Sequence, residues 1–201
     1  MNLDLTQLIA VAAALGWASG LRLYAVVFLT GMAGWLGWVN LPAGLQVLQQ
    51  PLVLGVAAVL VALEFVADKI PGVDTLWDAV HTFIRIPAGA ALAAGVFGAD
   101  SATWGVMAAL LGGTLAATAH TAKATTRAAA NTSPEPFSNI GLSLLGDAAV
   151  PGLLWLSWSH PVAFFVVLAF AVVLAVVLVV VFFRFLRGLL PRQWPRPVRS
   201  G

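Results

Sequence analysis

Six long apolar segments run through this sequence and limit what it can fold into. A helix needs roughly 20 apolar residues to cross about 30 Å of hydrocarbon. The segments lie at residues 8–38, 52–66, 80–97, 104–119, 140–158 and 162–183. Only 9% of the residues are charged, against about 25% in soluble domains. We therefore predict an all-α fold, a polytopic helical membrane protein with about six transmembrane helices.

The segments differ in how they should pack. The first is long enough to be tilted, or broken near Ser19 and Gly20. The first, third and fourth are rich in small residues, which let helices approach closely, so we expect them at the centre. Residues 162–183 have no polar residue and no glycine, which indicates a peripheral helix facing lipid.

Lysine and arginine predict the orientation, because cytoplasmic loops retain them. With six crossings, Lys69, Arg85, Lys123, Arg127 and the arginine-rich end fall on one side, and the opposite connections contain no Lys or Arg. We predict a bacterial inner-membrane protein with both termini in the cytoplasm. Residues 1–190 would form a single helical transmembrane domain, and residues 191–201 a basic cytoplasmic tail.

A weak internal repeat is also possible. Residues 35–38 (WLGW) resemble residues 155–158 (WLSW), and a proline follows each. Internal repeats are common in transporters. Interfacial anchoring of tryptophan explains the same similarity, so both interpretations stay open.

The stretch EFVADKIPGVDTLWDAVHTFIR, residues 64–85, concentrates ionisable groups. One helical face should carry Asp74, Asp78, His81 and Arg85, at i, i+4, i+7 and i+11. Glu64 and Asp68 are four residues apart at the end of the preceding helix. Pro87 should kink or break the helix just beyond.

A second polar stripe follows in AHTAKATTRAAANTSPEPFSN, residues 119–139. It consists of His120, Lys123, Arg127 and Asn131, at i, i+3, i+7 and i+11. The helix should stop before the sequence SPEP at 133–136, which cannot continue it.

The two stripes lie on the same side of the membrane in this topology, so we expect them to meet in a partly desolvated vestibule. Asp74 or Asp78 would face Lys123 or Arg127. The simplest interpretation is that ion pairs hold two helical extensions together. Alternatively, the cations bind a phosphate, or the carboxylates bind a hard cation.

Two ionisable residues lie deeper in the predicted helices, Arg22 in the first and Asp147 in the fifth. A charge at such depth normally pairs or lines a polar cavity. We predict an Arg22–Asp147 pair inside the bundle, serving as a structural tie or as part of a substrate or proton path.

Motifs for common chemistry are missing from the sequence. It has no cysteine, no H-E-x-x-H pair and no EF-hand spacing. A phosphate-cradling glycine loop and a nucleophile elbow are also lacking. We expect no cofactor and no metal, and an enzyme is the less favoured class.

Three blocks resemble a family of small bacterial integral membrane proteins described as a domain of unknown function. They are SGLRLY at 19–24, residues 64–90 and residues 119–144. The resemblance covers nearly the whole chain except the arginine-rich tail. It implies an inner-membrane protein in which both stripes are characteristic of the family, and it supplies no catalytic residue.

Three functions are consistent with these features. The favoured one is a small transport-type protein whose vestibule binds a polar or phosphate-bearing solute or ion; a homodimer is expected, because six short spans are few for a transporter. The second is a membrane-embedded enzyme or lipid handler acting on a phosphorylated headgroup, with His81 or His120 as acid or base. The third is a structural or assembly scaffold. Membrane lipids are expected partners and nucleic acid is not.

Overall fold

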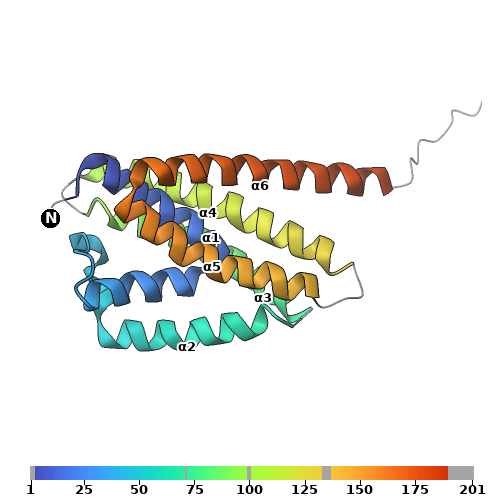
Figure 1. Cartoon of the computed structure of the whole chain (residues 1–201), viewed down its shortest axis with the longest axis horizontal. Helices are drawn as coiled ribbons and strands as arrows, with labels where there is room; N and C mark the ends of the chain where they lie inside the picture. The colour runs from blue at the N-terminus through green and yellow to red at the C-terminus, as the bar shows by residue number, and fades with distance from the viewer. Residues whose placement is uncertain (1–2, 71, 99–100, 133–136, 190–201) are drawn as a thin grey trace, which may run out of the picture.

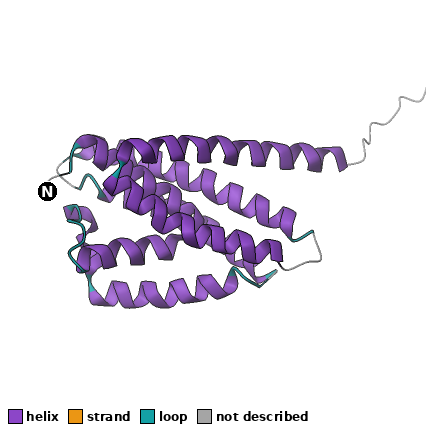
Figure 2. Cartoon of the chain, in the orientation of Figure 1, coloured by secondary structure: helices purple, strands orange, loops and turns teal. Residues whose placement is uncertain are grey.

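The computed structural model describes residues 3–70, 72–98, 101–132 and 137–189. In this part of the chain the secondary structure is helical throughout, with no strand (Figure 2). The elements are α1 (Leu5–Trp35), the 3-10 helix η1 (Ala43–Gln49), α2 (Pro51–Ala67), α3 (Val73–Gly95), α4 (Ala102–Ala130), α5 (Phe137–Ser159) and α6 (Pro161–Leu189). The predicted all-α class is confirmed. The predicted tail at 191–201 lies outside the described residues.

Four of these helices, α1, α4, α5 and α6, are long and apolar enough to cross a membrane. The consecutive helices η1 and α2 meet at 70° and together make a possible fifth span. The described helices therefore support a membrane protein, whereas the count of six spans and the internal repeat are not confirmed.

Local sequence signals explain several helix ends. Asp4 caps α1, since its side chain accepts a hydrogen bond from the Gln7 backbone nitrogen. Gly72, with φ of 87°, precedes α3 in a conformation that favours glycine. The α4 helix ends at Ala130, as predicted from SPEP, although residues 133–136 themselves are outside the described part. The sequence predicts a kink or a break at Pro87; the break does not occur, because α3 continues to Gly95.

The bundle has two ends, which Figure 1 separates along its long axis. We call one the η1 end; it contains η1 and the starts of α2, α4 and α6, at the left of the figure. We call the other the network end; it contains the end of α2 and the starts of α3 and α5. Each helix from α2 to α6 runs from one end toward the other (Figure 1).

Helix α1 behaves differently, because its backbone leaves the helical region at Arg22, with φ −149° and ψ 80°. Before the break it runs beside α4: Gly16 packs on Gly112, and Gly20 on Ala116. After the break Tyr24 reaches His81 of α3, and Gly31 returns to Leu48 of η1. The two arms of α1 therefore form a hairpin with Arg22 at its tip.

This hairpin changes the topology expected for the first segment. The sequence predicts one crossing, whereas the start and the end of α1 both lie at the η1 end (Figure 1). The predicted break near Ser19 and Gly20 is present, displaced to Arg22. In a bilayer placed across the long axis, the start of α1 and the end of α6 would lie on opposite sides, so the predicted shared side of the termini does not follow from this fold.

Small residues hold the first arm of α1 at the bundle centre. A Cβ on Gly16 would lie 2.5 Å from the Gly112 Cα, so the two backbones touch. Gly89 of α3 packs on Ala116 of α4. Of the three segments predicted at the centre, the first is enclosed, with 72% of its apolar stretch buried, whereas α4, with 22%, leaves one face exposed. Helix α6 is largely exposed, as expected of a peripheral helix.

Candidate functional site

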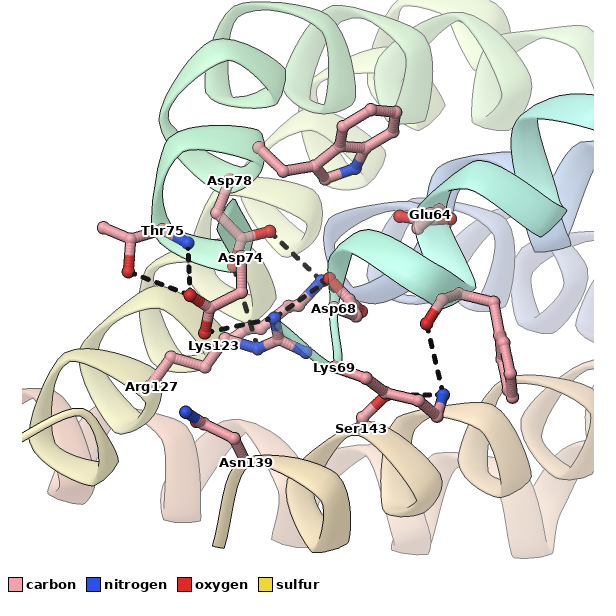
Figure 3. A network of polar contacts seen from close by, with 12 residues as sticks. Glu64, Asp68, Lys69, Asp74, Thr75, Asp78, Lys123, Arg127, Asn139 and Ser143 are labelled. Carbon is pink, nitrogen blue, oxygen red and sulfur yellow. Dashed lines mark hydrogen bonds and ion pairs between the residues drawn. The ribbon is translucent and has the colours of Figure 1, made fainter. Parts of the chain in front are cut away.

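Asp68 is the centre of a buried network of charges at the network end (Figure 3). It follows the last residue of α2 and is completely buried. Its carboxylate lies 2.8 Å from Arg22 Nη1, 2.9 Å from Arg127 Nη1 and 3.2 Å from Lys123 Nζ. One carboxylate thus joins the tip of α1 to two cations on α4.

A first branch leads from Lys123 into α3. Lys123 Nζ lies 3.1 Å from Asp78 Oδ1, and the same oxygen lies 2.7 Å from Arg85 Nη1. Arg85 is completely buried and places its Nη2 2.5 Å from Glu64 Oε1 of α2. The acids and bases therefore alternate along this branch, from Lys123 to Glu64.

A second branch leads from Arg22 into α5. Arg22 Nε lies 2.9 Å from Asp147 Oδ1, so the predicted Arg22–Asp147 pair is confirmed. Arg22 Nη2 also donates to the Ser143 hydroxyl, at 2.8 Å. Lys69 ends this branch, 3.4 Å from Asp147 and 3.2 Å from the Ser143 hydroxyl.

The outer edge of the network lies around Asp74. Its Oδ1 accepts hydrogen bonds from the backbone nitrogens of Gly72 and Thr75, while its Oδ2 lies 3.6 Å from Arg127 Nη1. Asn131 donates to Asp74 at 3.4 Å and accepts from Asn139 of α5. This edge ties the start of α3 to α4 and α5.

The histidines occupy internal positions. His120 lies 2.7 Å from the Thr82 hydroxyl and 3.3 Å from Arg85 Nη1. His81 lies 2.7 Å from the Trp77 carbonyl oxygen and 3.0 Å from the Tyr24 hydroxyl. Both ring nitrogens of each histidine are engaged within the bundle, so His81 and His120 leave no ring nitrogen for an acid or base role in this state.

The break in α1 is part of the network as well. A residue with non-helical dihedrals interrupts the backbone ladder and frees carbonyl groups. Lys123 Nζ donates to the freed Leu21 carbonyl oxygen at 3.0 Å. The same ammonium therefore caps the first arm of α1 and pairs with two carboxylates.

The ion pairs of this network join equal numbers of opposite charges. The acids are Glu64, Asp68, Asp74, Asp78 and Asp147, and the bases are Arg22, Lys69, Arg85, Lys123 and Arg127. Buried charges are costly unless paired and hydrogen-bonded. The balance explains how so apolar a bundle accommodates them.

The two predicted stripes meet within one chain, and Asp78 and Asp74 face Lys123 and Arg127 as expected. Nine of the ten predicted binding residues contact another member of this network, whereas His81 bonds to the Trp77 carbonyl oxygen and the Tyr24 hydroxyl. The site is more enclosed than the partly desolvated vestibule predicted, since Asp68, Asp74 and Arg85 are each 0% exposed.

Sequence reasoning missed Lys69, Ser143, Thr82, Asn139 and Tyr24 as parts of this site. Ser143 could have been predicted from the sequence, because it stands four residues before Asp147 and therefore shares its helical face. Lys69 adjoins Asp68 in sequence, but its reach to α5 depends on tertiary packing.

An apolar cavity of about 510 Å³ opens beside the network, between α1, α4, α5 and α6. Its polar lining comes from Arg22, Asp68, Lys123, Thr126 and Arg127. Most of the remaining lining is aliphatic and includes Leu142, Leu153, Leu156, Ala171 and Leu174. The cavity therefore has a charged end and a long apolar body.

Clustered carboxylates are also the ligands that a hard metal ion prefers. Within the described residues, no group of three or more His, Asp or Glu side chains is arranged to hold a metal ion. The carboxylates instead face arginine and lysine.

Comparison with known protein families identifies the family to which the chain is similar. The model of a family described as a domain of unknown function (DUF4126) matches residues 9–181. No curated protein and no solved structure matches the chain.

Proposed function

We propose that this chain, which belongs to the DUF4126 family, described as a domain of unknown function, is a transport-type membrane protein. It would move a polar or phosphate-bearing species across the membrane. The observation that carries this proposal is the break of α1 at Arg22 inside the bundle. Transporters often bind substrate at discontinuous helices, where backbone groups are freed. Here the freed Leu21 carbonyl oxygen and the Arg22 side chain are held by ion-pairing residues of other helices.

The pairing pattern supports a closed state of such a path. Arg22 shares its guanidinium between Asp68 of α2 and Asp147 of α5, and Ser143 accepts a further bond. A species that competes for Arg22 would loosen three helices at once. Since packed elements tend to have discrete alternative arrangements, we take these bonds as the contacts that exchange during transport.

We propose a bacterial inner membrane as the location, with the network end in the cytoplasm. Lys69, Lys123, Arg127 and Arg187 all lie toward this end, as the excess of positive charge on the cytoplasmic side requires. The N-terminal arm of α1 would then start on the outer side. The protein would act as a homodimer, because one hairpin and five helices are few to enclose a transport path.

The enzyme alternative has less support. Its candidate acids and bases, His81 and His120, have both ring nitrogens engaged in internal contacts. Neither is among the residues that line the cavity.

Proteoliposomes test the proposal directly. Translocation would be followed for two water-soluble probes, inorganic phosphate and glycerol phosphate, and for a headgroup-labelled phospholipid. Ser143→Ala and Asp147→Asn each remove one partner of Arg22 and leave its contact with Asp68 in place. We expect each to change the rate about tenfold, the equivalent of one charge-assisted hydrogen bond.

Arg187→Gln is the control, because Arg187 is an exposed cation in the last turn of α6. It should leave the rate unchanged. If none of the three probes moves above the rate of empty vesicles, the transport proposal is wrong. The oligomeric state of the same preparation, measured by native mass spectrometry, tests the homodimer.

A further inference from the structure

The cavity beside the network has a length that suits a hydrocarbon chain. On α5 its lining runs from Leu142 to Leu156, about 21 Å at 1.5 Å per helical residue. On α6 it runs from Val167 to Leu178. The long apolar body of the cavity therefore runs parallel to the helices, along the bilayer normal.

Small residues on α5 produce this space. Gly146, Ala149 and Gly152 stand three residues apart and all line the cavity. Such stripes usually let another helix approach closely. Here an added Cβ at Gly152 would meet nothing within 4 Å, and one at Gly146 would only reach Arg22 Nε at 3.6 Å. The stripe on α5 thus leaves a groove instead of a helix contact.

The groove is accessible from the side of the bundle. Two of its lining residues, Leu145 of α5 and Leu174 of α6, are 67% and 46% exposed. In a bilayer, such residues face acyl chains. A ligand with a hydrocarbon chain can therefore enter laterally, without passing through water.

The charged end determines which headgroup fits. Three cations, Arg22, Lys123 and Arg127, line it with a single carboxylate, that of Asp68. Each of these cations is also paired with a carboxylate of the network and is at most 10% exposed, so a phosphate reaches them by exchanging with those carboxylates. Arginine matches phosphate oxygens bidentately and lysine adds a point charge, and the Thr126 hydroxyl lies at the same end.

From this combination we propose that the cavity is a binding site for a membrane phospholipid with an anionic headgroup. One hydrocarbon chain lies along Gly146, Gly152 and α6, and the phosphate faces Arg22, Lys123 and Arg127. The inference rests on the proposed transport function in taking this lipid as the species that is moved. Binding itself is a separate property of the cavity.

The test uses the purified full chain, stripped of lipid in mild detergent and examined by native mass spectrometry. The probes are phosphatidic acid, phosphatidylcholine with the same acyl chains, and inorganic phosphate. We expect phosphatidic acid to bind at least about tenfold more tightly than phosphatidylcholine. Inorganic phosphate should neither bind comparably nor displace the lipid.

Two matched variants locate the site without disturbing the buried charges. Gly152→Phe places a ring in the open cavity, and Gly55→Phe places the same ring on the exposed face of α2, where a Cβ also meets nothing within 4 Å. Gly152→Phe should weaken binding of phosphatidic acid about tenfold or more. Gly55→Phe should bind it as the wild type does.

Three results would overturn the inference: equal binding of the two lipids, unchanged binding by Gly152→Phe, or inorganic phosphate binding as tightly as phosphatidic acid. The last would assign the cations to a free phosphate. The two proposals fail separately. Selective lipid binding with no translocation removes the transport function alone, whereas translocation of water-soluble phosphate that is unaffected by Gly152→Phe removes the lipid site alone.

Discussion

Asp68 Oδ2 lies 2.8 Å from Arg22 Nη1, joining the end of α2 to the tip of the α1 hairpin. Both side chains are almost completely buried. Lys123 and Arg127 share the same carboxylate. The position of the α1 tip in the bundle therefore depends on a charge that belongs to another helix.

The first prediction concerns this shared carboxylate. Asp68→Asn removes the negative charge that three cations face, and loss of one member of a buried ion pair typically costs about 3–5 kcal/mol. We expect a large fall in the unfolding temperature, measured by scanning fluorimetry in detergent. Asp147→Asn is the comparison, because Asp147 is 25% exposed and should cost less. Equal effects of the two variants would contradict the central role of Asp68.

The second prediction is a coupling between Glu64 and Arg85. Each single change, Glu64→Gln or Arg85→Met, leaves the other charge buried with fewer partners. The double variant should therefore be more stable than the sum of the single losses predicts, by about 0.5–3 kcal/mol. A double-mutant cycle on chemical unfolding measures this.

The pair Lys69–Asp147 provides the control for this cycle. Its side chains are 23% and 25% exposed, and exposed pairs contribute about 0–1 kcal/mol. If the coupling energy of Glu64–Arg85 is no larger than that of Lys69–Asp147, burial does not strengthen the coupling, and the prediction is wrong.

The third prediction tests the helix contact between α1 and α4. Gly16→Ala places a Cβ against the Gly112 backbone, and overpacking of this kind costs about 1–3 kcal/mol. Gly55→Ala meets nothing within 4 Å and removes a glycine from a helix, so it should be neutral or stabilising by up to about 1 kcal/mol. Thermal unfolding of the two variants in one detergent compares them. Similar losses would argue against the close backbone approach.

The fourth prediction concerns topology. Because the α1 hairpin returns to the η1 end, single cysteines at Thr6 and Asn40 should react from the same side of the membrane with an impermeant maleimide. A cysteine at Ala129, near the end of α4, should react from the opposite side. All three positions are exposed in the bundle. If Thr6→Cys reacts from the same side as Ala129→Cys, and Asn40→Cys from the opposite side, the first segment crosses the membrane once and the hairpin is wrong.

Hydropathy and helical spacing were sufficient for much of the fold. The apolar segments predicted the helices, because burial in hydrocarbon requires local runs of apolar residues. The i, i+4, i+11 spacing placed Asp74, Asp78 and Arg85 on one face, and all three are buried there. The Arg22–Asp147 pair followed from the cost of isolated charges in a membrane.

The sequence by itself determined the membrane class, the helix positions and the residues that had to be paired. Only the tertiary structure decided that α1 turns back at Arg22, that Asp68 collects three cations, and that α5 leaves a cavity beside them. The physical reason is the range of the interactions. Hydropathy and spacing are local properties, whereas the hairpin depends on one residue's dihedral angles, held by Asp68 and Asp147 of distant helices.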